Sequence, residues 1–95
     1  MKHYTEKYSK ELIQVFSSIN GEQKMMKEFL IDILTPKEFE DLALRWQIVK
    51  RLFHEETQRS IAKDLGLGIA TVSRGSRELR NKKGGFLLVL KKIIK

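Results

Sequence analysis

Residues 57–80 have the sequence TQRSIAKDLGLGIATVSRGSRELR, and this stretch decides the expected fold. Thr57 is a suitable N-cap for a short helix over residues 58–65. Gly66-Leu67-Gly68 predicts a tight turn, because Gly66 falls where a positive φ is usually needed. A second helix is predicted from about Ile69 to Arg80. Two short helices joined by such a turn form a helix-turn-helix.

The apolar residues of this stretch predict how the two helices pack. Ile61, Ala62 and Leu65 are expected to face inward from the first helix, and Ala62 is small enough for a close crossing. Ile69 and Val72 are expected to anchor the second helix. The opposite faces are polar and basic, and the bland alternative is an ordinary helical hairpin with a solvated basic face.

A helix that enters the major groove uses hydroxyl and guanidinium groups to contact bases and phosphates. The second predicted helix offers such groups, and the first offers side chains that can contact the sugar-phosphate backbone. The candidates for DNA contact are Gln58, Arg59, Lys63, Gly68, Ile69, Ala70, Thr71, Ser73, Arg77 and Arg80.

The basic charge is confined to one part of the chain. Residues 57–95 contain ten basic and two acidic side chains, whereas residues 1–34 contain five of each. The formal net charge of +7 therefore comes from the helix-turn-helix and the residues C-terminal to it. A localised basic patch favours a polyanionic partner, with double-stranded DNA first and an anionic membrane second.

The other segments also predict helices. Apolar residues recur at helical spacing from Tyr4 through Tyr8 to Ile19, and Asn20-Gly21 ends that helix. Met25 to Ile33 gives a second helix. Thr35, Pro36 and Glu38 form the pattern of a capping box, which begins a third helix that continues to Phe53. Asn81–Gly85 interrupts the chain before a last short helix over residues 86–94.

We therefore expect an all-α chain of about six helices, forming a single domain over residues 1–95 of 11.1 kDa. Several helices have more apolar surface than so short a chain can cover, which favours a homodimer. The sequence has no cysteine and no apolar run long enough to span a membrane. We expect a cytoplasmic protein without a membrane partner, a metal site or a catalytic set of residues, and hence not an enzyme.

The motifs also resemble a known family. Leu34-Thr35-Pro36, Arg45, Ile48-Val49, Gln58-Arg59 and the run LGLGIATVSRGS at 65–76 closely resemble the bacterial Trp repressor family. The match covers residues 34–80 in register, with one residue fewer in the turn before Thr57.

The resemblance implies an intertwined, all-helical homodimer that binds operator DNA when loaded with L-tryptophan as corepressor, and no other cofactor. It implies that Arg45 and Arg74 sandwich the indole, and that Arg74 also binds the carboxylate with help from Thr35. The backbone carbonyls of Asp32 and Leu34, from the other subunit, would accept the ammonium, and Gly75 would leave room for the indole. Glu78 stands where the family has a small polar residue close to the ligand.

Plainer interpretations stay open for these residues. Arg45 fits a surface arginine lying over apolar neighbours, Arg74 fits a phosphate contact, and Gly75 fits the close approach of another helix. The carboxylate of Glu78 keeps open a regulator of the same fold with a different ligand or none. A basic structural or RNA-binding protein is the rival from another class, although the chain lacks the aromatic motif of RNA-binding sheets.

Overall fold

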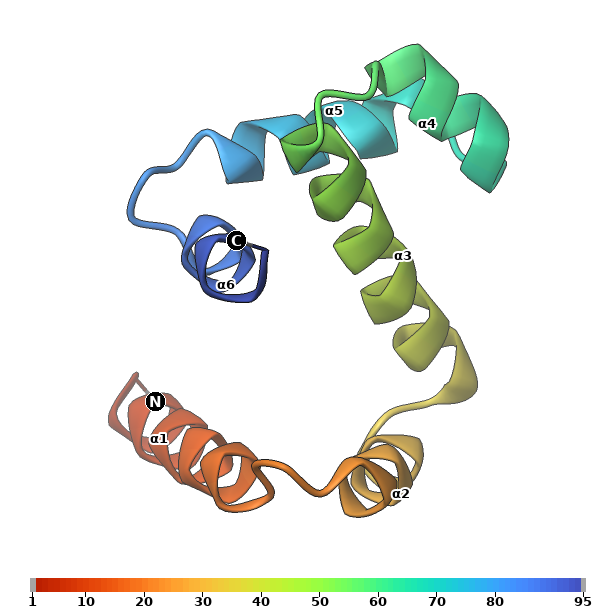
Figure 1. Cartoon of the computed structure of the whole chain (residues 1–95). Helices are drawn as coiled ribbons and strands as arrows, with labels where there is room; N and C mark the ends of the chain where they lie inside the picture. Colours follow the sequence, from red (N-terminus) through yellow and green to blue (C-terminus); the bar gives the residue numbers. More distant parts are fainter. Residues whose placement is uncertain (1, 95) are drawn as a thin grey trace. The chain divides into compact units, whose positions relative to one another are not determined.

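The computed structural model describes the backbone of residues 2–94 and the side chains of residues 5–94. Over these residues the chain is all-α, as predicted. The described residues form six helices, which are labelled in Figure 1: α1 (Lys2–Ser18), α2 (Gln23–Ile33), α3 (Pro36–Phe53), α4 (Gln58–Leu65), α5 (Ile69–Leu79) and α6 (Gly85–Ile93). The fifth and sixth helices each end one residue earlier than the sequence predicts. Tyr4, expected on the apolar face of the first helix, lies outside the described side chains.

The chain divides into two compact units, Met1–Phe39 and Glu40–Lys95. In the first unit, the rings of Phe16 and Phe29 meet edge to face with centroids 5.5 Å apart, which packs α1 against α2. Ile19, which directly follows α1, is 6% exposed. A single domain over the whole chain stays a prediction.

The capping box predicted for α3 is present. The Thr35 backbone N–H donates to Glu38 Oε1 at 2.8 Å, and the Glu38 N–H donates to Thr35 Oγ1 at 3.1 Å. At the other end, Glu55 adopts φ 66°, and the N–H of Glu56 donates to the carbonyl of Arg51 at 3.0 Å. This is a left-handed helix cap in which glutamate stands where glycine is usual.

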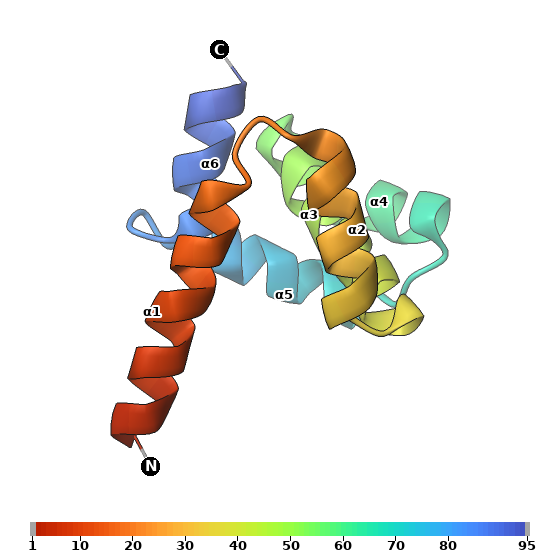
Figure 2. The same ribbon diagram turned by 90° about the horizontal axis from the view of Figure 1, so that it is seen from below.

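Residues 57–79 form the predicted helix-turn-helix. Thr57 Oγ1 accepts the Ser60 N–H at 3.1 Å, and Gly66 closes α4 with φ 68°. In Figure 2, α4 lies beside the start of α5, which then runs on towards α6. The core that joins these helices to α3 consists of Ile48, Ile61, Ala62 and Val72, with Leu52, Leu65 and Leu67 packed against it.

One predicted core position is wrong. Ile69 is 53% exposed, whereas Val72 is fully buried and alone anchors this face of α5. Ile69 is the first residue of α5 and directly follows the glycine turn, so no earlier helical turn covers its side chain.

An ion pair also joins α3 to α4. Arg51 donates a hydrogen bond to Asp64, and its Nε lies 3.9 Å from Glu56 Oε2. The hydrogen bond to Asp64 raises the pKa of Arg51 above its usual value. None of the helices in the described part of the chain is long and apolar enough to cross a membrane.

Candidate functional site

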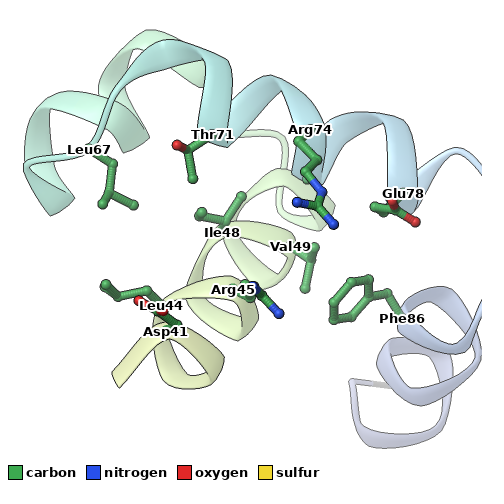
Figure 3. A pocket seen from close by; sticks show the side chains of 11 residues that line it. Asp41, Leu44, Arg45, Ile48, Val49, Leu67, Thr71, Arg74, Glu78 and Phe86 are labelled. Atoms are coloured by element: carbon green, nitrogen blue, oxygen red, sulfur yellow. The ribbon is translucent and has the colours of Figure 1, made fainter. Parts of the chain in front are cut away.

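A pocket of the second unit lies between α3, α5 and α6 and has a volume of about 460 Å³ (Figure 3). This volume is within the range of small-molecule sites. Its apolar walls come from α3, from the turn before α5 and from α6, whereas α5 contributes polar and charged side chains and a glycine. The complete lining is Asp41, Leu44, Arg45, Ile48, Val49, Leu67, Thr71, Arg74, Gly75, Glu78 and Phe86.

Helical spacing explains why these residues meet. On α3, Asp41 lies four residues before Arg45, and Ile48 and Val49 lie three and four residues after it, so all four share one face of that helix. Thr71, Arg74 and Glu78 have the same spacing on α5. In Figure 3 the side chains of Arg45 and Arg74 approach the pocket from opposite helices. Two guanidinium groups therefore face one apolar cavity.

The structure brings together Arg45, Arg74, Gly75 and Glu78, four of the seven residues proposed for ligand binding. The other three, Asp32, Leu34 and Thr35, belong to the first unit. Asp32 is an exposed residue of α2, Leu34 is its C-cap, and Thr35 forms the capping box of α3. Their role in ligand binding stays a prediction.

Gly75 marks the place where α5 crosses α3. A Cβ atom added to this glycine would lie 2.6 Å from Ile48 Cγ2, much closer than two carbon atoms can approach. Ile48 is 2% exposed and cannot easily move away. The close approach of α3 is thus sufficient to explain the glycine, as the plainer interpretation held. The contact between Gly75 and Ile48 also forms part of the wall of the pocket.

Phe86, Leu67 and Asp41 line the pocket but were not expected there. Asp41 could have been found from its position four residues before Arg45 on the same helix. Phe86 follows the Gly84-Gly85 interruption, and its place depends on how the loop of residues 81–84 turns. This loop is closed by the Gly84 N–H, which donates to the carbonyl of Asn81 at 2.9 Å.

The basic surface of the helix-turn-helix is open to solvent. Eight of the ten candidates for DNA contact are exposed: Arg59, Lys63, Gly68, Ile69, Ala70, Thr71, Arg77 and Arg80. The other two are half-buried and bind each other, since the Ser73 hydroxyl donates to Gln58 Oε1 at 2.7 Å. This bond ties α4 to α5 and leaves the amide N–H₂ of Gln58 as a donor.

A helix-turn-helix with an exposed basic face, next to a pocket of small-molecule size, is typical of regulators that bind DNA. The family model described as Trp repressor protein matches residues 9–94. The chain thus belongs to the Trp repressor family, whose members are DNA-binding regulators, and it is a DNA-binding repressor.

Individual relatives agree with this assignment. A Trp operon repressor homolog of Vibrio campbellii is 44% identical over 73 residues, which are 76% of this chain and 69% of the relative. A protein of the same name from Vibrio parahaemolyticus is also 44% identical over 73 residues, covering 76% and 67%. The crystal structure of a TrpR-like protein from Eubacterium eligens superposes with a TM-score of 0.82 at 27% identity, covering 90% of this chain and 88% of that one.

Proposed function

We propose that this repressor acts as a homodimer and that L-tryptophan, bound in the pocket between α3, α5 and α6, is its corepressor. The observation that supports this most directly is the pairing of Arg45 and Arg74 across an apolar cavity. Guanidinium planes stack on aromatic faces and bind carboxylates through a matched pair of donors. An aromatic amino acid offers both partners.

The position of the pocket provides the link to DNA. Thr71, Arg74, Gly75 and Glu78 line it from α5, the helix that offers Arg77 and Arg80 to the outside. Helix-turn-helix dimers, the Trp repressor among them, insert one such helix from each subunit into successive major grooves. A ligand wedged between α3 and α5 would favour one tilt of α5. The ligand would raise DNA affinity because it binds more tightly to the tilt of α5 that fits DNA than to the other tilt. The ratio of these two ligand affinities limits the gain in DNA affinity.

Measuring DNA binding with and without saturating L-tryptophan tests this proposal. We expect a large gain in affinity for a palindromic operator and little for random DNA, because only paired half-sites require the correct tilt of both helices. Equal enhancement on both DNAs, or none on either, would contradict corepression by tryptophan. The alternative is then a regulator of the same fold with a different ligand or none.

Calorimetry on two pocket variants tests whether tryptophan occupies this pocket. Arg74→Ala should lose most tryptophan binding, since hydrogen bonds to charged groups contribute about 1.5–3 kcal/mol. Arg45→Ala should weaken binding less, because it removes stacking and leaves the carboxylate partner. If both variants bind tryptophan like the wild type, the ligand does not occupy this pocket.

A further inference from the structure

Asp64 is a carboxylate in a place that disfavours negative charge. It lies in the last turn of α4, where the free carbonyl groups of the helix repel an anion. It is also one of only two acidic residues in the basic stretch 57–95, the other being Glu78. In a motif that binds polyanionic DNA, an unpaired carboxylate at this place would weaken binding. A cationic partner within the protein offsets both effects.

Arg51, in the last turn of α3, is this partner. Its guanidinium donates a hydrogen bond to Asp64 on α4, and its Nε lies 3.9 Å from Glu56 Oε2. The carbonyl of Arg51 also accepts the N–H of Glu56 at 3.0 Å, because the left-handed turn at Glu55 brings the chain back towards the end of α3. Arg51 thus holds the turn with its main chain and α4 with its side chain.

The ion pair adds a contact at the C-terminal end of α4. The N-terminal end of this helix is tied to α5 through the hydrogen bond of Gln58, and its middle is buried at Ile61. The bond from Asp64 reaches α3 instead. Contacts at three places, directed at two different helices, fix how α4 is turned about its own axis. Two exposed cations of this helix, Arg59 and Lys63, turn with it.

We propose that Arg51 is a positioning residue for DNA binding. By pairing with Asp64 it fixes the orientation of α4 on α3, and with it the position of the cationic side chains that α4 offers to phosphate. Arg51 acts through α4 and not through a DNA contact of its own. The inference concerns the DNA-binding activity of the chain and does not depend on which ligand occupies the pocket.

The sign of one substitution separates positioning from simple charge. Asp64→Ala removes a negative charge and introduces a better helix former, and both changes by themselves favour a DNA-binding α4. Loss of the ion pair has the opposite effect. The side chain of Arg51 is 27% exposed and that of Asp64 is 62% exposed, so the pair is partly screened by solvent. We expect Asp64→Ala to weaken DNA binding about threefold, a modest effect in keeping with such a pair.

The effect of Asp64→Ala should change sign when Arg51 is already absent. Arg51→Met keeps an unbranched, apolar side chain and removes the charge. By itself it should weaken DNA binding, and in its background Asp64→Ala should strengthen binding, because only the charge effect is left. Lys50→Met is the matched control. Lys50 is a half-buried cation beside Arg51 on α3 and forms no ion pair with a described residue, so in that background Asp64→Ala should still weaken binding.

Fluorescence anisotropy at one salt concentration measures these affinities. The probe is a labelled duplex that the wild type has selected from a random-sequence library. L-Tryptophan is present in every sample, so the comparison does not depend on whether it is the corepressor. Circular dichroism checks that each variant is folded. Hydrogen exchange without DNA gives a second readout, in which the amides of α4 should exchange faster in Arg51→Met and Asp64→Ala than in Lys50→Met.

A conservative variant tests whether the cation is what matters. Arg51→Lys keeps the charge but loses the planar set of donors, so its DNA affinity should lie between those of the wild type and Arg51→Met. In this background Asp64→Ala should still weaken binding.

Two results would overturn the proposal. Stronger DNA binding by Asp64→Ala in the otherwise wild-type chain would mean that charge alone governs the affinity. Weakening of equal size with and without Arg51 would mean that Asp64 acts independently of this arginine.

Discussion

The packing of α5 onto α3 explains the glycine at position 75 without any ligand. A glycine inside a helix is unfavourable by about 1 kcal/mol relative to alanine. The close approach of Ile48 Cγ2 on α3 explains why glycine is nevertheless present. At this residue the need to pack α5 onto α3 outweighs intrinsic helix propensity.

Gly75→Ala should therefore lower the free energy of unfolding, although alanine is the better helix former. Overpacking is unfavourable by about 1–3 kcal/mol and the gain in propensity is about 1 kcal/mol, so we expect a net loss of about 1 kcal/mol. Urea unfolding measures it. In an Ile48→Leu background, which removes the methyl group on Cβ at similar volume, the loss should shrink. An equal loss in both backgrounds would show that Ile48 is not the obstacle.

At the scale of elements, α4 and α5 are joined by a core and by one polar bond. The buried side chains of Ile61 and Val72 hold the helices together, and the hydrogen bond from Ser73 to Gln58 fixes how they face each other. Ser73 was expected to contact DNA through its hydroxyl. That hydroxyl already has a partner within the protein, which makes positioning of Gln58 its main structural role.

Ser73→Ala should lower the free energy of unfolding by about 1 kcal/mol, because Gln58 Oε1 loses its donor in a half-buried place. Ser76→Ala is the matched control, since Ser76 has similar burial on the same helix and forms no side-chain hydrogen bond with a described residue. Urea unfolding at a fixed protein concentration measures both. A comparable loss in Ser76→Ala would assign the effect to helix α5 in general.

Arg77 is expected to contact phosphate and Thr71 to contact a base. Arg77→Ala should weaken binding to all DNA sequences alike and flatten the slope of log K against log salt by about 0.9. Thr71→Ala should change the preferred sequence and keep the slope. Anisotropy titrations over a salt series measure both. An unchanged slope in Arg77→Ala would remove this residue from the phosphate contacts.

Most element boundaries could be predicted because their signals are local. Thr35 and Thr57 cap helices through their own hydroxyls, and Gly66 ends α4 through its own φ. Glu55 was missed because a glutamate in the left-handed region has no distinct pattern in the sequence. The pocket was predicted only in part: Arg45 and Arg74 were recognised by resemblance, whereas Phe86 depends on the path of a loop. The exposure of Ile69 was missed because helical spacing ignores where a helix begins.

At the scale of the whole molecule, apolar side chains remain exposed on several helices. Their exposed fractions range from 38% for Leu12 to 63% for Ile13 and Ile93. Exposed apolar surface on a folded domain often marks an interface. The exposed side chains on α1 and α6 are Tyr8, Leu12, Ile13, Leu88, Val89 and Ile93.

We expect a particle of about twice 11.1 kDa by light scattering at micromolar concentration. Leu88→Glu should shift the population towards monomer, because it places a charge on the exposed apolar face of α6. Lys91→Glu introduces the same residue on the same helix at an already charged, exposed position, and it should leave the dimer intact. A folded monomer of the wild type at this concentration would contradict the homodimer.

The contact between Gly75 and Ile48 also constrains how this protein can diverge. An alanine at position 75 is harmful while Ile48 keeps the methyl group on its Cβ. After a substitution at position 48 has removed that methyl group, alanine at position 75 no longer clashes, and its better helix propensity stabilises the fold. The two positions should therefore change together among descendants of this chain, and in one order, with position 48 first. A helix crossing that looks like simple packing thus determines which evolutionary paths are open.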